Sequence, residues 1–283
     1  MSHPRGKPRL GTRPRIIRHA GLRWEVLPGG EEIVRCRGDW SIDALSENFR
    51  EAVLRRKRAE RVVFRMAHPG GDAVVKAQLS VGHKPLVRSL YGRNKGRKEW
   101  ENHLIALDAG LPIVQPLAYG ELKKLGMVHE SVVISEWRPG AITITEWRRG
   151  HADRAGDAAG QDIAAKLGRL VAAAQGHGIY HNEISFKNVL IENAGPDPQL
   201  VLIDWKHARI RRRTTQDDVR NVIKTGRYYT EFLAHAVAAE PEKRAFLRAY
   251  LDATADRPDR AEFLAGLRRA CPAAEWIDAE FDG

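Results

Sequence analysis

The most informative segment of the sequence is a polar loop at residues 177–191 that carries a histidine, an acid and an amide. His181 comes two residues before Glu183, and Asn188 follows Glu183 by five residues and leads into the apolar run 189–191. A carboxylate in such a loop can accept the proton of an incoming hydroxyl group, and an amide oxygen can bind Mg²⁺. This order matches the catalytic loop of enzymes that transfer a phosphoryl group from ATP. We therefore predict that Glu183 and Asn188 are catalytic and that His181 supports the loop by hydrogen bonding.

A second acid ends the apolar run 201–203. Asp204 comes 16 positions after Asn188, and a carboxylate there can hold Mg²⁺ against the β- and γ-phosphates of a nucleotide. We predict that Asn188 and Asp204 are the metal ligands and that Asp204 is catalytic. The corresponding protein-kinase motif is Asp-Phe-Gly, whereas this chain has Asp204-Trp205-Lys206. The missing glycine argues against a glycine-dependent flip of this segment, but not against metal binding.

A lysine and a glutamate in the first half of the chain complete the set. Lys76 ends the β-rich run Val74-Val75-Lys76, on the second strand of a predicted hairpin, where it can point toward nucleotide phosphates. Glu99 lies near the start of a predicted helix and can hold the lysine in place, with Glu101 as the competing carboxylate. Taken alone, an exposed strand lysine and a solvated helix glutamate are the commoner interpretations. The order of all the residues favours the catalytic one.

These residues need a scaffold with strands first and helices later. The first half has a predicted hairpin, a helix and two further strands, at residues 61–66 with 73–77, 99–109, 117–121 and 131–137. The second half has predicted helices and short apolar strands, at residues 162–175, 189–191, 199–204, 241–254 and 258–270. This arrangement indicates an α+β, protein-kinase-like fold with two lobes: a small β-rich N-lobe and a larger, mainly helical C-lobe.

The predicted domains follow from this change of character. They are a basic N-terminal arm and hairpin at residues 1–40, an N-lobe at 41–138 and a C-lobe at 139–283. Pro139-Gly140 is expected to break the chain between the lobes.

Three finer predictions concern the beginning of the chain. Residues 1–20 have the composition of a disordered basic arm. Residues 23–37 are predicted to form a hairpin around Pro28-Gly29-Gly30. Residues 41–58 are predicted to form a helix capped by Ser41.

The composition narrows the class of partner. The net charge is +11, from 47 Lys and Arg against 36 Asp and Glu, and a basic surface favours phosphate-rich partners.

The cysteines, Cys36 and Cys271, lack metal-ligand spacing, so zinc is not expected. No apolar run has the length of a membrane span and residues 1–18 lack the apolar core of a signal peptide. We expect a cytoplasmic protein, with peripheral contact at the cytoplasmic face of the inner membrane as an option. Nucleic acid is not expected, because no interleaved aromatic and basic motif is present.

Several further stretches resemble one known family. They are Asn48-Phe-Arg, Gly96-Arg-Lys-Glu-Trp100, the run from Leu107 to Pro112, Ala118-Tyr-Gly-Glu121, Val133-Ile-Ser-Glu136 and Ile203-Asp204. With the strand lysine and the His181 loop, they resemble the lipopolysaccharide core heptose/Kdo kinase family of Gram-negative bacteria. The resemblance extends from about residue 48 to about residue 209 and implies a protein-kinase-like fold, ATP and Mg²⁺ as cofactors, and a sugar hydroxyl of the inner core as acceptor.

The sequence departs from the kinase pattern in two places. The usual catalytic Asp is Glu183, whose extra methylene moves the carboxylate by about one bond length, and about 1 Å of misplacement can cost roughly 10²-fold in rate. No G-x-G-x-x-G segment is present, and the phosphate-covering position falls near residues 55–59. Arg55 and Lys57 are expected to bind the nucleotide there, together with Lys76, Glu99 and Glu136, although a solvated basic face is an equal alternative for Arg55 and Lys57.

Three hypotheses for function remain open from the sequence. The first is a kinase that acts on an anionic glycolipid, with Glu183 as the base. The second is a pseudokinase or a nucleotide-regulated binding module, because Glu183 replaces Asp. The third is a kinase of another small molecule or of a protein, since the fold does not choose the acceptor. The sequence gives no oligomeric state.

Overall fold

The computed structural model describes most of the chain in two compact units. The described residues are 13–48, 53–56, 61–80, 94–151, 156–193, 197–222, 240–256 and 259–270. Unit 1 is Met1–Asp108 with Ile113–Pro139, and unit 2 is Ala109–Pro112 with Gly140–Gly283. Among the described residues, no helix is long and apolar enough to cross a membrane.

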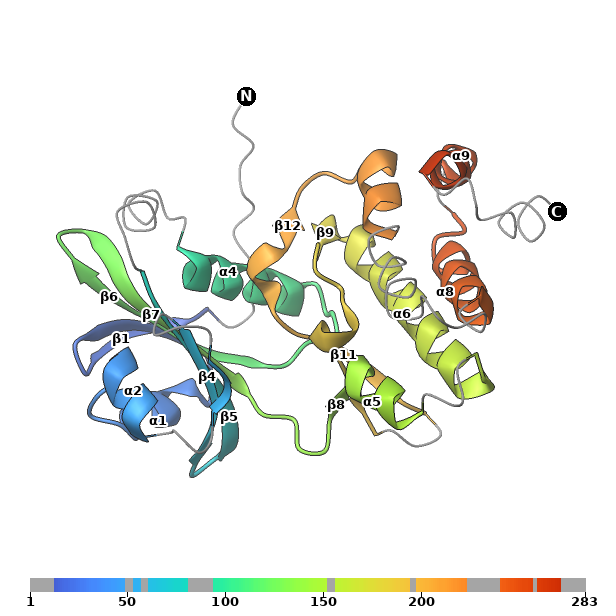
Figure 1. The fold of residues 1–283 in the computed structure, drawn as a ribbon. Helices are drawn as coiled ribbons and strands as arrows, with labels where there is room; N and C mark the ends of the chain where they lie inside the picture. The colour runs from blue at the N-terminus through green and yellow to red at the C-terminus, as the bar shows by residue number, and fades with distance from the viewer. Residues whose placement is uncertain are drawn as a thin grey trace. The chain divides into compact units, whose positions relative to one another are not determined.

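Unit 1 is built on a seven-stranded antiparallel sheet (Figure 1). Its strand order is β1-β2-β6-β7-β5-β4-β3. The strands are β1 (Arg15–His19), β2 (Leu22–Val26), β3 (Val53–Arg56), β4 (Arg61–His68), β5 (Gly71–Leu79), β6 (Pro116–Lys124) and β7 (Met127–Glu136).

The strands β4 and β5, in which β5 alternates buried and partly exposed residues, are joined by a tight turn. Phe64 pairs with Val75, and the register continues to His68 and Gly71. Gly71 has a φ of 126°, a backbone conformation that favours glycine. The predicted hairpin is confirmed, and the strands predicted at 117–121 and 131–137 are confirmed as β6 and β7.

Helices cover both faces of this sheet. Neighbouring residues of a strand point to opposite faces. Val75 and Ile134 lie in the larger apolar cluster, which contains residues of α1 (Gly30–Arg35) and α2 (Ile42–Asn48). Val133, the neighbour of Ile134, lies in a smaller cluster with residues of α4 (Lys95–Asp108). The helix predicted at 99–109 is therefore confirmed as α4, on the face opposite α1 and α2.

The beginning of the chain differs from its prediction. The hairpin is β1–β2, so the arm predicted for residues 1–20 is wrong for the residues of β1; residues 1–12 lie outside the described part. The turn is at Ala20 and Gly21, which both have positive φ, and this pair suits the twist of a two-residue hairpin loop. Gly29 and Gly30 instead begin α1. The hairpin predicted around them is therefore wrong.

The helix predicted for residues 41–58 is also shorter than expected. The described part of this range contains α2 (Ile42–Asn48) and then β3 (Val53–Arg56), so its second half is not all helical. Val53 pairs with Phe64 of β4, so pairing at the edge of the sheet overrides the helix propensity of this stretch.

Unit 2 is mainly helical. Its helices are α5 (Ile144–Gly150), α6 (Ala158–Gly176), a helix at residues 215–222, α8 (Glu240–Asp252) and α9 (Arg260–Ala270). Its short strands form two small sheets, one of β11 (Gln199–Leu202), β10 (Val189–Glu192) and β8 (Ile142–Thr143), the other of β12 (Arg209–Ile210) and β9 (Ile179–Tyr180). The predicted helices at 162–175, 241–254 and 258–270 are confirmed as α6, α8 and α9, and the predicted strands at 189–191 and 199–204 as β10 and β11.

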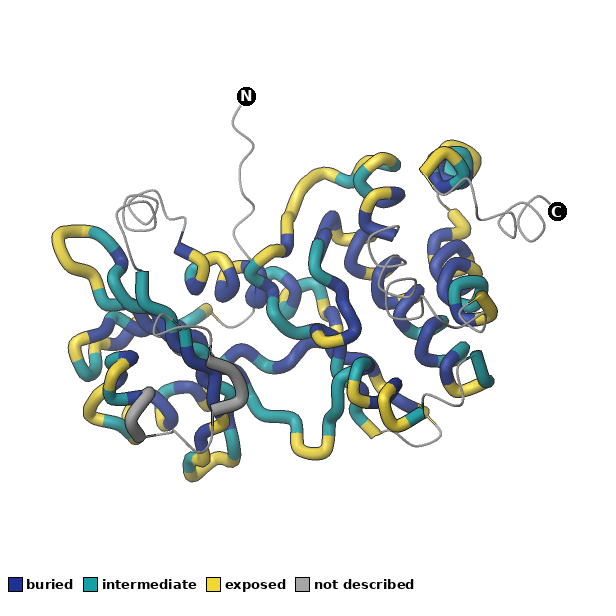
Figure 2. The backbone as a smooth tube through the Cα atoms, in the orientation of Figure 1, coloured by how far each residue is buried: buried dark blue, intermediate teal, exposed yellow. Residues whose placement is uncertain are grey.

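The core of unit 2 lies between α6 and α8, where the facing residues are buried (Figure 2). A Cβ atom on Gly168 would lie 2.2 Å from the carbonyl oxygen of Phe246, so only glycine allows this approach. Nearby, Arg148 of α5 forms a fully buried ion pair with Glu242 of α8. Strands with one long helix in unit 1 and a helical unit 2 confirm the α+β class.

Candidate active site

The lysine and glutamate predicted in unit 1 form an ion pair. The Nζ atom of Lys76, on β5, lies 2.5 Å from Oε1 of Glu99, on α4. Both side chains are largely buried, with exposed fractions of 17% for Lys76 and 6% for Glu99. Glu101, the competing carboxylate, is exposed. The ammonium is therefore held at one place on the face of the sheet that α4 covers.

The loop after β9 in unit 2 is tied by a series of short-range hydrogen bonds. The amide of Glu183 donates to the carbonyl oxygen of His181, and the amide of Ser185 donates to that of Glu183. Asn188 then donates its side-chain Nδ2 back to the carbonyl oxygen of Glu183 at 2.8 Å. Asn182 has a φ of 57°, which asparagine tolerates better than most residues. These bonds fix the distance along the loop between the acid and the amide.

His181 joins this loop to the segment after β11 that carries Asp204. Its Nε2 lies 3.0 Å from the carbonyl oxygen of Ile203, and its ring packs edge-on against the buried indole of Trp205. The amide of Ile203 donates to the carbonyl oxygen of Asn188 at 3.0 Å. Because both bonds end at Ile203, Asp204 is held beside Asn188. The supporting role predicted for His181 matches this geometry.

Glu183 lies among basic side chains. Its Oε1 is 3.4 Å from Nε2 of His207, and its Oε2 is 3.8 Å from Nζ of Lys206. The Glu183 side chain is 34% exposed, so an acceptor hydroxyl can reach it from solvent. Lys206 also donates to Oδ2 of Asp204 at 2.5 Å. One ammonium group therefore links the two carboxylates predicted for the base and the metal.

The residues proposed for Mg²⁺ suit that ion. Asn188 uses its Nδ2 as a donor, which leaves its amide oxygen as an acceptor, and Asp204 offers a mostly buried carboxylate. The described residues contain no group of three or more His, Cys, Asp or Glu side chains placed to hold a metal. Mg²⁺ does not need one, because it takes most of its ligands from water and nucleotide phosphates and one or two from protein oxygens. Asp204 adopts the left-handed conformation, with a φ of 65°, a conformation uncommon for residues other than glycine and seen at functional sites.

A buried hydrogen bond fixes the strand that leads into the loop. The hydroxyl of Tyr180, just before the loop, donates to Oδ1 of Asp218 at 2.9 Å, and Arg213 pairs with Oδ2 of the same carboxylate. Burial and this hydrogen bond raise the pKa of Tyr180 well above its ordinary value, so the hydroxyl stays protonated and keeps donating.

Three predicted nucleotide-binding residues remain: Glu136, Arg55 and Lys57. The carboxylate of Glu136, at the end of β7, accepts the amide of Gln115 at 2.7 Å and pairs with Arg138, so its side chain has a structural partner. Arg55 lies in β3, opposite Val63. Lys57 lies outside the described residues. The sequence prediction missed Lys206 and His207 as neighbours of Glu183, although both follow directly on the Asp-Trp pair.

We compared the sequence and the fold with those of known proteins. A model of the lipopolysaccharide kinase (Kdo/WaaP) family matches residues 47–250. The chain belongs to this family. The resemblance seen in the sequence is therefore confirmed, and the chain is a phosphotransferase of the kinase type.

The fold is similar to that of a solved member of the group. A structure described as WaaP in complex with acyl carrier protein has a TM-score of 0.59 and 19% sequence identity, and the match covers 93% of this chain and 99% of that chain. At this identity the likeness shows the fold, which is kinase-like. A comparison with curated proteins found no match.

Proposed function

We propose that this family member is an ATP- and Mg²⁺-dependent kinase that phosphorylates a sugar hydroxyl, heptose or Kdo, of the lipopolysaccharide inner core. One observation carries the proposal: Asn188 is bonded to the backbone of Glu183, while Lys206 links Glu183 to Asp204. Phosphoryl transfer to a hydroxyl group requires a base and oxygen ligands for the metal ion. Glu183 is the proposed base, and Asn188 and Asp204 offer an amide oxygen and a carboxylate. Residues 41–138 are proposed as the nucleotide-binding lobe, and residues 139–283 as the lobe that carries the catalytic base.

In the proposed reaction, Glu183 accepts the proton of the sugar hydroxyl. The hydroxyl oxygen forms a bond to the γ-phosphorus of ATP, the bond from that phosphorus to the bridging oxygen breaks, and ADP leaves. Lys76, fixed by Glu99, neutralises nucleotide phosphate charge. Asn188 and Asp204 would hold Mg²⁺, which would supply further positive charge to the phosphates. Arg55, Lys57 and Glu136 are proposed as further nucleotide contacts.

The surface beside the base supports an anionic acceptor. His207 and Arg209 are exposed on the segment that leads away from Asp204, and Arg212 follows them. Among the described residues, neither Arg209 nor Arg212 has an ion-pair partner. Free guanidinium groups bind phosphate and carboxylate in two-point contacts. Inner-core sugars that carry such groups would therefore bind here, and a negatively charged membrane surface would attract the same side chains.

A pseudokinase is the second candidate function. It is favoured by one observation, the glutamate at position 183 in place of the usual aspartate. The longer side chain moves the carboxylate by about one bond length, which can cost roughly 10²-fold in rate. The contacts of the Glu183 carboxylate with His207 and Lys206 argue for a held, functional carboxylate.

The test is transfer of labelled phosphate from γ-labelled ATP to purified inner-core lipopolysaccharide with Mg²⁺. We expect transfer by the native chain and a loss of about 10²-fold or more in Lys76→Ala and in Glu183→Gln. Glu183→Asp distinguishes the two candidates, since it should retain or raise activity if the carboxylate is the base. Binding of Mg²⁺-ATP without transfer to any sugar acceptor would favour the pseudokinase. Full transfer in Glu183→Gln would remove Glu183 as the base.

A further inference from the structure

One row of residues crosses the sheet of unit 1 from Lys76 to the N-terminal hairpin. Lys76 of β5 is opposite Val133 of β7, which is opposite Tyr119 of β6, which is opposite Glu25 of β2. Directly paired residues on neighbouring strands point to the same face. Glu25 is therefore on the same face as Lys76, three strands away, or roughly 14 Å at the usual strand spacing.

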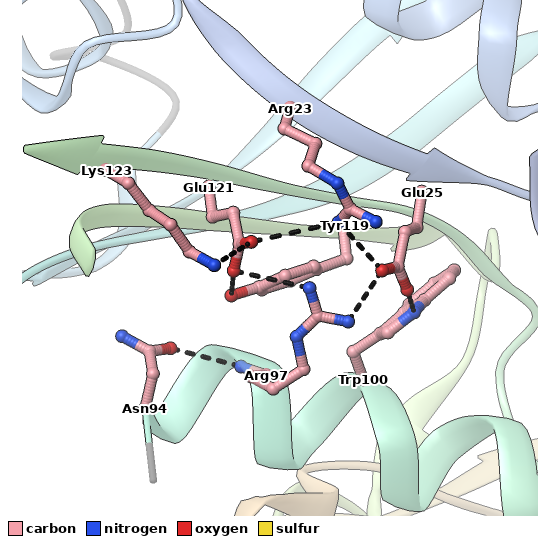
Figure 3. Close-up of polar contacts among 8 residues, drawn as sticks. All are labelled: Arg23, Glu25, Asn94, Arg97, Trp100, Tyr119, Glu121 and Lys123. Carbon is pink, nitrogen blue, oxygen red and sulfur yellow. Dashed lines mark hydrogen bonds and ion pairs between the residues drawn. The ribbon is translucent and has the colours of Figure 1, made fainter. Parts of the chain in front are cut away.

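Helix α4 is bound at both ends of this row. At one end, Glu99 pairs with Lys76. At the other end, Glu25 accepts two hydrogen bonds from α4, one from Nη1 of Arg97 at 2.7 Å and one from Nε1 of Trp100 at 2.9 Å (Figure 3). Arg97, Glu99 and Trp100 lie within one helical turn. This turn of α4 is thus held to β5 by the Lys76–Glu99 ion pair and to β2 by the hydrogen bonds to Glu25.

A network of charges around Arg97 strengthens the contact on the Glu25 side (Figure 3). The guanidinium lies over the ring of Tyr119, 4.4 Å from its centre, and 3.3 Å from Oε2 of Glu121. Tyr119 donates to the same carboxylate at 3.0 Å. Burial raises the pKa of Glu25, but the contacts with Arg97, Arg23 and Trp100 together outweigh it, so the net pKa is lowered and Glu25 stays ionised at neutral pH.

Glu25 lies before the residues that the family model matches, whereas its partners Arg97 and Trp100 lie within them. The family model matches residues 47–250, and Glu25 belongs to β2, before that range. Strand β2 nevertheless continues the sheet next to β6. The hairpin β1–β2 therefore adds to the sheet a residue that binds the helix carrying Glu99.

We infer that Glu25 is a positioning residue, which holds α4 through Arg97 and Trp100 so that Glu99 stays on Lys76. The inference rests on the proposed function, in which the Lys76–Glu99 pair binds nucleotide phosphate. Without Glu25, Trp100 loses its hydrogen bond and Arg97 keeps only its contacts with Glu121 and Tyr119. The turn is then held less firmly on this side, and α4 can shift. The ammonium would then lose its carboxylate for part of the time, and the lysine would be less well placed for the phosphate.

The test compares Glu25→Gln with the native chain by two readouts. The first is the rate at which an amine-directed acylating reagent modifies Lys76 without ATP, followed by mass spectrometry of peptides. We expect this rate to rise about fivefold, because the Lys76 side chain is only 17% exposed in its ion pair with Glu99 and becomes more accessible to the reagent when that pair opens. The second is phosphate transfer, for which we expect kcat to fall about tenfold, the size that loss of a hydrogen bond to a charged group produces.

A double variant separates positioning from general destabilisation. If Glu25 acts through Glu99, then adding Glu25→Gln to Glu99→Gln should leave kcat nearly unchanged from that of Glu99→Gln alone. Lys123→Ala is the matched control, since Lys123 pairs with Glu121 at 3.0 Å from an exposed position on β6 and not with α4. It should have native labelling and native kcat.

Three outcomes would overturn the inference: native labelling of Lys76 in Glu25→Gln, an equal rise in Lys123→Ala, or a further tenfold loss of kcat in the double variant. If Glu25→Gln does not fold, Trp100→Phe replaces it, because phenylalanine keeps an aromatic ring but lacks the N–H donated to Glu25. The labelling readout needs no acceptor. A chain that fails to phosphorylate lipopolysaccharide but gives the expected labelling would refute the proposed function alone.

Discussion

The ammonium of Lys206 lies 2.5 Å from Oδ2 of Asp204, the carboxylate that we propose as a magnesium ligand. The two side chains are 15% and 13% exposed, so solvent screens the pair only weakly. The same ammonium is 3.8 Å from Glu183. Lys206 therefore neutralises Oδ2 of Asp204, and a metal ion would have to compete with this ammonium for the carboxylate.

The first prediction is that Lys206→Met binds Mg²⁺ more tightly. Lys206 and the metal compete for one carboxylate, so removing the ammonium should lower the half-saturating Mg²⁺ concentration about tenfold, which corresponds to about 1.4 kcal/mol. A Mg²⁺ titration of ATP turnover measures this value. The matched control is Lys187→Met, which changes an exposed lysine in the same loop system and should leave the Mg²⁺ dependence native. An unchanged titration in Lys206→Met would contradict the competition.

The second prediction concerns the acceptor. Replacing Arg209 and Arg212 together by serine should raise KM for lipopolysaccharide about tenfold, because two exposed guanidinium groups would no longer bind its anionic groups. KM for ATP should stay native, and the difference from the native chain should shrink as salt is added. Arg18→Ser is the control, since it removes an exposed arginine from β1. An equal rise of KM in Arg18→Ser would show a non-specific charge effect.

The third prediction tests the packing of α6 on α8. Gly168→Ala should lower the free energy of unfolding by about 2–3 kcal/mol, because the new Cβ would lie 2.2 Å from the carbonyl oxygen of Phe246 and the backbone must move. Gly176→Ala in the same helix has no atom within 4 Å of the new Cβ. It should raise stability by about 0.5 kcal/mol through the lower chain entropy of alanine. Denaturant unfolding measures both, and similar values for the two variants would refute the close approach.

The fourth prediction is an acid-dependent contribution of Glu25 to stability. Its pKa is lowered in the folded chain, with the contacts from Arg97, Arg23 and Trp100 together outweighing the effect of burial. The stabilisation is therefore complete above the ordinary pKa of a glutamate and is lost as the pH falls through the lower, folded pKa. The native chain should exceed Glu25→Gln in melting temperature at pH 7, and the gap should close as the pH falls below about 4.5. A gap that is constant with pH would mean that the charge does not contribute.

Several elements could be predicted because local sequence determines them. The hairpin β4–β5 follows from alternating apolar residues around a turn that Gly71 can adopt. The loop from His181 to Asn188 follows from the spacing of its polar residues before an apolar strand. The pairing of Lys76 with Glu99 was also predicted, since their order along the chain matches a known site.

Other features were decided by the tertiary structure. The hairpin β1–β2 was missed because its strands are short and because β2 is stabilised by pairing with β6, far along the chain. The contact of Lys206 with Glu183 was missed because it crosses from one loop to the next.

The residue types that we propose for phosphoryl transfer, and their order, could be read from the amino-acid sequence alone, since they depend on motifs of a few residues. Only the tertiary structure decided that Glu25 and Lys76 lie on one face of one sheet and bind one turn of α4. The register of four strands determines that arrangement. Register depends on the packing of residues up to a hundred positions apart, and no local pattern encodes it.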